Sequence, residues 1–265
     1  MLQTEVTLRH SDHRYFDNEG NEYASVSKML GTLKEPFDAD MMSKRCAGKG
    51  KYAGMTAKEV RTAWTANAKE STDHGSSIHD AIDNYTKTGK IKDADTVLDS
   101  MLKSIVSDYI PYKKTYDECV MYLKFDEPCG QYHGIAGMSD RILVVTKSIA
   151  DVEDYKTNIK KGIEFNSKYN QYMKYPVEHL QDCNFNQYSL QLSVYGLLYE
   201  NLTQSKIRSL WIRFIPQDDP LNHRRIPIPY LRTDAINAIR NFQELQNKTE
   251  FAPIKTMDTD IPSFG

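Results

Sequence analysis

The stretch SIADVEDYKTNIK, residues 148–160, follows an apolar run and places two acids, a tyrosine and a lysine in a row: Glu153, Asp154, Tyr155 and Lys156. Side chains of a strand alternate between its two faces, so Asp154 and Lys156 share one face and Tyr155 points to the other. A carboxylate beside an ammonium on one face of a sheet has two interpretations. It is either an ion pair of modest stabilising value or part of a site that binds a metal ion.

Length and composition limit what can surround this stretch. The chain has 265 residues and a mass of 30.5 kDa, enough for one large domain or two small ones. No apolar run is long enough to span a membrane, and residues 1–14 lack the apolar core of a signal peptide. The four cysteines are scattered without a C-x-x-C pair, so we expect a reduced protein of the cytoplasm with no membrane association.

The distribution of charge is more informative than its total of −2. Residues 32–69 carry eight Lys or Arg against four Asp or Glu, and residues 205–248 repeat that balance. Two basic flanks around an acidic centre suit a polyanion whose site is partly neutralised by metal. Ordinary solvated surface charge is the simpler explanation of the same counts.

The first third of the chain predicts a hairpin followed by helices. Residues 14–30 hold two short aromatic-bearing strands around a turn of Asp, Asn and Gly. Helical spacing predicts later helices at residues 74–89, closed by Gly89, and over about 93–116. The earlier helices begin at capping side chains, which are Ser25 or Ser27, Asp38, and Thr56 with Glu59 as a capping box.

Beyond residue 117 the pattern changes from helix to strand. Short β-rich segments broken by Gly and Pro at 118–125, 132–145 and 148–157 predict a meander. A helix with a buried face is predicted over about 184–202, followed by two strands and a last helix at 233–249. This order indicates an α/β fold with a helical N-terminal portion.

We expect these elements to form a single domain over residues 1–255. Its parts are an N-terminal hairpin with helices (1–70), a core (71–202) and C-terminal strands with a helix (203–250). An acidic tail follows at 256–265, and we expect it to lie free.

Four elements supply polar groups that suit phosphodiester hydrolysis. Asp140 and Asp154 come from two strands of the meander, and carboxylate oxygens are the ligands that Mg²⁺ and Mn²⁺ prefer. The backbone carbonyl of Tyr155 could complete the set, and His79 could add an imidazole, which suits Mn²⁺ better than Mg²⁺. We therefore expect Mg²⁺ or Mn²⁺ as the cofactor.

Catalytic roles can be assigned to three further side chains. Lys156 would hold the attacking water and stabilise the developing negative charge. Gln191 and Tyr195 lie one helical turn apart, where Gln191 could orient the water or phosphate and Tyr195 could contact the substrate backbone. Simpler explanations exist, with His79 a structural histidine, Asp140 a turn residue, and Gln191 with Tyr195 a polar helix face.

The motifs run in the order GSSIHDAID (75–83), GMSD (137–140), EDYKT (153–157) and QLSVY (191–195). This order resembles the RecB-type branch of the PD-(D/E)XK nuclease superfamily. The first motif is similar to the family's G-x-x-x-H-x-x-x-E, with Asp83 in place of Glu. The resemblance covers roughly residues 70–200 and is to phage-encoded exonucleases of that branch. D-x-K alone is a weak signal, whereas four motifs in order are a specific one.

The resemblance implies a mixed central β-sheet flanked by helices, the restriction-endonuclease-like core, and metal-dependent cleavage of DNA, usually from an end. It also implies an additional acidic ligand at Glu118, where several relatives carry an acid. Asp83, one turn after His79, would either orient the imidazole or be simple surface charge. We therefore expect a metal-dependent DNA exonuclease of phage recombination, replication or DNA degradation, acting on single-stranded or duplex ends.

Two further features indicate partners. The tail MDTDIPSFG (257–265) is similar to the acidic tips of single-stranded-DNA-binding proteins, which implies docking to such a protein or to a recombinase. Residues 166–188 combine lysines with many aromatic side chains, which either stack unpaired bases or pack a long connection into the core. These aromatic residues are Tyr169, Tyr172, Tyr175, Phe185 and Tyr188.

Two other classes of protein compete with this interpretation. Iron–sulfur nucleases of the same superfamily need cysteines near the C-terminus, and none follows Cys183, so we expect no cluster. A non-catalytic nucleic-acid-binding module that retained the fold would usually lose Asp154 or Lys156, and this chain keeps both.

Overall fold

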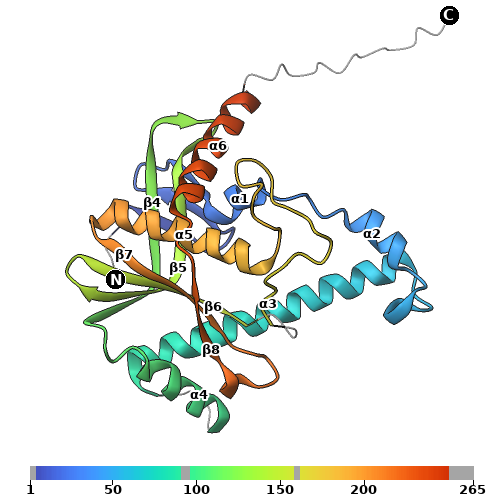
Figure 1. Cartoon of the computed structure of the whole chain (residues 1–265), viewed down its shortest axis with the longest axis horizontal. Helices are drawn as coiled ribbons and strands as arrows, with labels where there is room; N and C mark the ends of the chain where they lie inside the picture. The colour runs from blue at the N-terminus through green and yellow to red at the C-terminus, as the bar shows by residue number, and fades with distance from the viewer. Residues whose placement is uncertain (1–3, 91–95, 158–161, 251–265) are drawn as a thin grey trace, which may run out of the picture.

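The computed structural model describes residues 4–90, 96–157 and 162–250 and builds one eight-stranded sheet covered by helices (Figure 1). The order of strands is β1-β2-β3-β5-β6-β7-β8, with β4 on the remaining edge of β5. The predicted α/β class with a mixed central sheet and a helical N-terminal portion is confirmed. The strands are β1 (Val6–Arg9), β2 (Arg14–Asp17), β3 (Glu22–Ser25), β4 (Lys114–Cys129), β5 (Tyr132–Thr146), β6 (Ile149–Lys156), β7 (Lys206–Phe214) and β8 (Arg224–Ile228).

Three of the six helices in the described residues begin at the capping side chains that the sequence predicts. Ser25 accepts a hydrogen bond from the amide of Lys28 at 3.0 Å, and Asp38 accepts one from the amide of Met41 at 2.8 Å. The capping box of Thr56 and Glu59 is formed. The helices are α1 (Val26–Gly31), α2 (Ala39–Cys46), α3 (Ala57–Thr88), α4 (Thr96–Ser107), α5 (Asn184–Thr203) and α6 (Arg232–Glu250), with short 3-10 turns at Gly50–Tyr52 and Pro220–Asn222.

Two helix predictions are wrong in extent. The two helices expected at 56–70 and 74–89 are one helix, α3, of 32 residues, because Gly75 and its neighbouring serines do not end a helix that packs against the sheet. The helix expected over 93–116 is only α4, which ends at Ser107 before a strand begins at Lys114. Pro111 cannot continue a helix and excludes the helical conformation for the residue before it.

β5 changes its partner half-way along, which creates a fork in the sheet. β4 pairs with one edge of β5 along nearly its whole length. On the other edge β3 pairs in parallel with Ile135 and Ala136, whereas β6 pairs antiparallel from Arg141 onward. The C-terminal ends of β3 and β6 therefore face each other across residues 137–140. Ligands of open α/β sheets bind outside the carboxyl ends of strands, where the direction of the topology changes.

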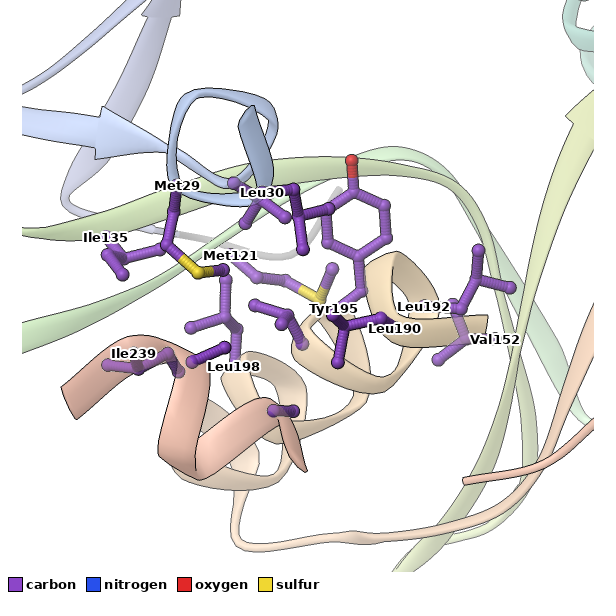
Figure 2. Close-up of a cluster of buried hydrophobic side chains, with 14 of the residues drawn as sticks. Met29, Leu30, Met121, Ile135, Val152, Leu190, Leu192, Tyr195, Leu198 and Ile239 are labelled. Atoms are coloured by element: carbon purple, nitrogen blue, oxygen red, sulfur yellow. The ribbon is translucent and has the colours of Figure 1, made fainter. Parts of the chain in front are cut away.

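The two faces of the sheet carry separate apolar clusters. Helices α1, α5 and α6 cover one face, where Met29, Leu190 and Ile239 are fully or nearly fully buried (Figure 2). Helices α3 and α4 cover the other face through Ile82 and Leu102. None of the helices in the described segments is long and apolar enough to cross a membrane.

Candidate functional site

Two carboxylates face each other at the fork of the sheet. The last regular pair between β5 and β6 joins Arg141 to Glu153, so Asp140 and Asp154 occupy the next facing positions. Asp140 lies inside β5, one of the predicted strands of the meander. Its Oδ2 accepts a hydrogen bond from the backbone amide of Tyr155 at 2.7 Å, which ties the side chain to β6. The structure thus brings the two predicted acids together.

Both strands around Asp140 interrupt their regular alternation. Ile135 and Ile142 are an odd number of residues apart and would point to opposite faces of a regular strand, yet both pack in the cluster beneath α5. In β4 the irregular position is Glu118, whose φ of +45° lies in the left-handed region that few non-glycine residues adopt. Irregularities of this kind redirect neighbouring side chains, and here they place Asp140 against β6.

Lys156 completes the pair of acids. Its ammonium forms an ion pair with the Asp154 carboxylate, from the same face of β6. The ammonium also lies 4.7 Å from the centre of the Tyr188 ring on α5. Tyr188 was not assigned to the site from the sequence, although it shares a helix face with Gln191 and Tyr195 at i, i+3 and i+7.

His79 reaches the same place from α3. Gly75, one turn earlier, lets the helix approach the end of β6, because a Cβ atom there would lie 3.1 Å from Oγ1 of Thr157. The Nδ1 atom of His79 lies 3.4 Å from Oδ1 of Asp140, and its ring meets the Tyr155 ring edge-on at 5.2 Å between centroids. The G-x-x-x-H spacing therefore has a physical basis, in which Gly75 provides the close approach that His79 uses.

The site has fewer permanent positive charges than carboxylates. Burial and then the neighbouring Asp140 carboxylate, opposed by Lys156, raise the pKa of Asp154 to about 6. Burial also raises the pKa of Asp140, but the hydrogen bond with His79 and the charge of Lys156 leave it below its usual value. Burial lowers the pKa of Lys156, yet Asp154 and Asp140 hold it above its usual value, so the ammonium stays charged.

This donor set fits a hard divalent cation. Mg²⁺ is bound in many sites by one or two carboxylates, with the remaining positions filled by water and substrate phosphate. Asp140 and Asp154 supply such a pair, and a cation between them would remove the repulsion that raises the pKa of Asp154. In the described segments, no three His, Cys, Asp or Glu side chains are arranged to bind one metal ion. His79 would therefore have to move to become a ligand of the cation. The role of the Tyr155 backbone carbonyl as a metal ligand stays a prediction.

The surroundings of Tyr195 do not suit its predicted role, whereas the role of Gln191 stays a prediction. Tyr195 is only 5% exposed, and its ring packs in the apolar cluster beneath β5 (Figure 2). Gly137 makes this packing possible, since a Cβ there would lie 2.6 Å from the ring. The amide nitrogen of Gln191 donates a hydrogen bond to the Tyr195 hydroxyl at 3.0 Å. Tyr195 therefore holds Gln191, and its burial does not suit the predicted contact with a substrate backbone.

Asp83 and Glu118 have surroundings that the sequence did not indicate. Asp83 is buried and ion-paired at 3.1 Å with Arg141 rather than with His79, so neither of its two predicted roles describes it. Arg141 is fully buried, and its Nε also donates a hydrogen bond to the Tyr155 hydroxyl at 2.5 Å. Glu118 is exposed at the rim of a hollow on β4, and its role as a ligand stays a prediction.

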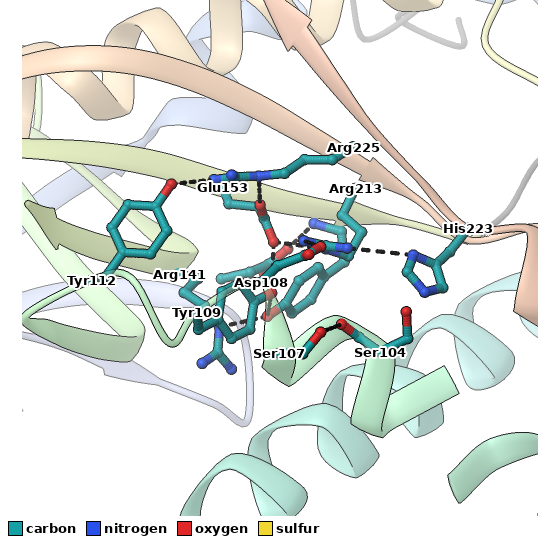
Figure 3. A network of polar contacts seen from close by, with 12 residues as sticks. Ser104, Ser107, Asp108, Tyr109, Tyr112, Arg141, Glu153, Arg213, His223 and Arg225 are labelled. Atoms are coloured by element: carbon teal, nitrogen blue, oxygen red, sulfur yellow. Dashed lines mark hydrogen bonds and ion pairs between the residues drawn. The ribbon is translucent and has the colours of Figure 1, made fainter. Parts of the chain in front are cut away.

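A second cluster of charges lies on the opposite face of the sheet, towards α4 (Figure 3). Glu153 accepts hydrogen bonds from Nε of Arg213 at 2.8 Å and Nε of Arg225 at 2.5 Å. Arg208 donates hydrogen bonds to both carboxylate oxygens of Asp151, from Nε at 3.0 Å and from Nη2 at 2.7 Å. Three of the eight basic residues in the predicted basic flank at 205–248 are thus paired in this framework. A charged residue inside the apolar run of β7 was the signal that could have revealed it.

Comparison with known proteins gives distant structural likeness. No family model and no curated protein matches the chain. The crystal structure of SSO0001 is similar with a TM-score of 0.38 and 15% identity, over 90% of this chain and 89% of that one. A structure from Eubacterium rectale named "Putative exonuclease" is similar with a TM-score of 0.39 and 10% identity, over 85% of this chain and 82% of that one. Likeness at this level says nothing of chemistry, which rests on the geometry above.

Proposed function

We propose that this chain is a divalent-metal-dependent deoxyribonuclease that removes nucleotides from DNA ends, of the RecB-type branch of the PD-(D/E)XK superfamily. The observation that carries the proposal is the pair of facing carboxylates, the half-buried Asp140 and the buried Asp154, at a fork of the sheet beside Lys156. A site short of positive charge attracts a cation and, through the cation, a phosphate.

The residues of the site would have separate roles in the reaction. Asp140 and Asp154 would hold Mg²⁺ or Mn²⁺, which when bound supplies Lewis acidity and lowers the pKa of its water. Lys156 acts as a fixed positive charge and not as a base, because its raised pKa keeps the ammonium protonated near neutrality. It would position the attacking water and stabilise negative charge on the phosphate. Gln191, held by Tyr195, would donate a hydrogen bond to the water or the phosphate.

His79 adds a group that responds to the metal. Burial lowers its pKa, but the hydrogen bond and charge of Asp140 raise it above the usual value, which favours an imidazolium beside the carboxylate. Binding of a divalent cation by Asp140 would favour the neutral imidazole, which can then serve as a ligand. Manganese should therefore support activity at least as well as magnesium.

The cellular setting is proposed with the activity. A phage-encoded enzyme of DNA recombination, replication or degradation would act in the cytoplasm of its host on single-stranded or duplex ends. A single-stranded-DNA-binding protein or a recombinase would be its partner, through the tail at 256–265, which lies outside the described residues.

The test is degradation of end-labelled DNA with Mg²⁺, with Mn²⁺ and with EDTA, using linear single-stranded, linear duplex and circular substrates. We expect metal-dependent loss of linear DNA that falls by about a thousandfold in Lys156→Ala. Lys147→Ala, on the exposed turn at the other end of β6, is the matched control and should retain full activity. Binding of DNA without cleavage under both metals would contradict the proposal and favour a non-catalytic nucleic-acid-binding module.

A further inference from the structure

The described surface has an uneven distribution of aromatic rings. Five aromatic side chains are exposed in the described residues, and four of them lie within the eleven residues from 165 to 175. Their exposed fractions are 55% for Phe165, 81% for Tyr169, 48% for Tyr172 and 65% for Tyr175. We call these four side chains the aromatic segment. Aromatic rings placed in water at this density mark a binding surface more often than single exposed apolar residues do.

The backbone of the aromatic segment is fixed by contacts other than its rings. Met173 and Val177 are buried and anchor the segment in the cluster beneath α5. The amide of Met173 donates to the carbonyl of Leu180 at 2.9 Å, and the amide of Lys174 donates to the carbonyl of Leu33 at 2.8 Å. Packing of a long connection therefore uses the aliphatic side chains. The core explanation of the exposed rings is wrong, and they are available to another molecule.

Two aromatic side chains of α5 contact the aromatic segment at one end and the site at the other. The Phe165 ring lies 4.8 Å from the Phe185 ring, in a tilted contact. Phe185 is three residues before Tyr188 on α5, so the two side chains share a helix face. Tyr188 in turn lies over the ammonium of Lys156. The rings thus begin at the lysine of the site and end at the exposed surface.

The aromatic segment lies beside the start of a basic stretch of the chain. Lys174 forms an ion pair at 3.1 Å with Glu35, in the connection that leads into α2. That connection opens residues 32–69, which carry eight basic side chains against four acidic ones. Rings alone would suit an apolar protein partner, but rings that lead to a lysine beside two candidate metal ligands suit the bases of a nucleic acid.

We propose that the aromatic segment stacks the unpaired bases of a DNA strand whose phosphate lies at Asp140 and Asp154. This inference rests on the proposed function and deepens it, because the faces of bases are free to stack on rings only in an unpaired strand. The substrate class is then a single-stranded end or a duplex with a single-stranded overhang. The blunt end of a paired duplex offers the rings no succession of bases.

The experiment measures equilibrium binding of a labelled oligothymidylate and of a blunt duplex to the full chain in EDTA, by fluorescence anisotropy. Phe165→Ala with Tyr169→Ala should weaken oligothymidylate binding by about tenfold or more for each ring, and duplex binding by less than about threefold. Tyr169→Trp keeps a stacking face and should bind as the wild type does. Ile110→Ala removes an equally exposed apolar side chain beyond α4 and is the matched control.

Each outcome decides between the alternatives. Unchanged oligothymidylate binding in the double variant overturns the proposal and assigns the rings to a protein partner. Equal weakening on duplex, or equal weakening by Ile110→Ala, also overturns it. A wild type that binds oligothymidylate through these rings but cleaves no DNA with Mn²⁺ supports the stacking surface and overturns the nuclease, so the two failures are distinguishable.

Discussion

Glu153 and Asp154 are neighbours on one strand, both are buried, and their surroundings are opposite in kind. Glu153 points towards α4 and receives hydrogen bonds from Arg213, Arg225 and the Tyr109 hydroxyl, the last at 2.6 Å. Asp154 points towards α5 and has Lys156 on one side and a second carboxylate on the other. A carboxylate in the same strand therefore serves as framework on one face and as part of a candidate cation site on the other.

The difference is one of charge balance. The framework cluster pairs three carboxylates with three guanidiniums, which are Asp108, Asp151 and Glu153 with Arg208, Arg213 and Arg225. The site has two carboxylates for one permanent positive charge, on Lys156, and a histidine whose charge depends on pH and is lost when a cation binds Asp140. A buried charge without a partner is costly, so a balanced cluster holds a fold together and an unbalanced one requires a ligand. Mutations on the two faces should therefore have opposite signatures.

The largest expected effect is on activity. Asp154→Asn should lower DNA cleavage by at least about a thousandfold, because the site loses a ligand and half of its negative charge. Its free energy of unfolding should change by less than about 1 kcal/mol, since Asp140 still balances Lys156 and the repulsion is gone. Cleavage rates and urea denaturation of the same preparation check both parts. A large loss of stability in this variant would contradict the claim that the site, unlike the framework cluster, contributes little to stability.

The next effect is the reverse, on stability. Glu153→Ala should lower the free energy of unfolding by about 3–5 kcal/mol, because it leaves the buried Arg213, the partly buried Arg225 and the Tyr109 hydroxyl without their shared acceptor. Urea or thermal denaturation measures it. Arg208→Ala, at the partly exposed edge of the same cluster, is the milder comparison. A loss as small as that of a surface substitution would mean that this cluster is not a framework.

A smaller effect should appear at Arg141, which connects the two faces. It binds Asp83 and the Tyr155 hydroxyl, and the Tyr155 ring contacts His79. Arg141→Lys keeps the charge but loses the forked geometry, so His79 should be held less firmly. We expect Mn²⁺ affinity to fall about 10–100-fold, as for loss of a residue that orients a ligand, with a folded protein by circular dichroism. Unchanged affinity would restrict Arg141 to the framework.

The smallest effect is on the pH dependence of stability. Burial, opposed by Arg141, raises the pKa of Asp83 from 3.8 to about 6 in the folded chain. The folded state therefore binds this proton more tightly than the unfolded one, and its stabilising contribution is lost as pH rises from about 4 to about 6, by at most about 1.4 kcal/mol per pH unit. Asp83→Asn should flatten this part of the profile. Denaturation midpoints in EDTA across that range measure it, and an unchanged slope would contradict the raised pKa.

Local signals in the sequence predicted much of this architecture. The caps at Ser25, Asp38 and Thr56 act within one helical turn, and the meander of β4, β5 and β6 follows from turns and apolar runs. The length of α3 depended instead on packing against the sheet, whereas the end of α4 before Pro111 was a local signal that the prediction had not used. The fork in β5 could not be predicted either, because it arises from β3, a strand more than a hundred residues earlier in the chain.

The residues of the site were predictable from the sequence, but the side chains that hold them in place were not. Asp140, Asp154, Lys156 and His79 come together because motif order and strand alternation determine their positions. Tyr195 was assigned to the substrate because sequence spacing shows that it shares a face with Gln191 but not how deeply that face is buried. The pairing of the basic flank with acids across the sheet requires the register of β6 and β7, which no local pattern contains.

Titration of Mn²⁺ into the metal-free protein by isothermal calorimetry tests the central claim most directly. We predict that the wild type and Glu153→Gln bind the ion with similar affinity, while Asp154→Asn and Asp140→Asn bind it at least tenfold more weakly. Equal Mn²⁺ affinity in the wild type and in both aspartate variants would contradict the claim that the unbalanced carboxylates form a cation site.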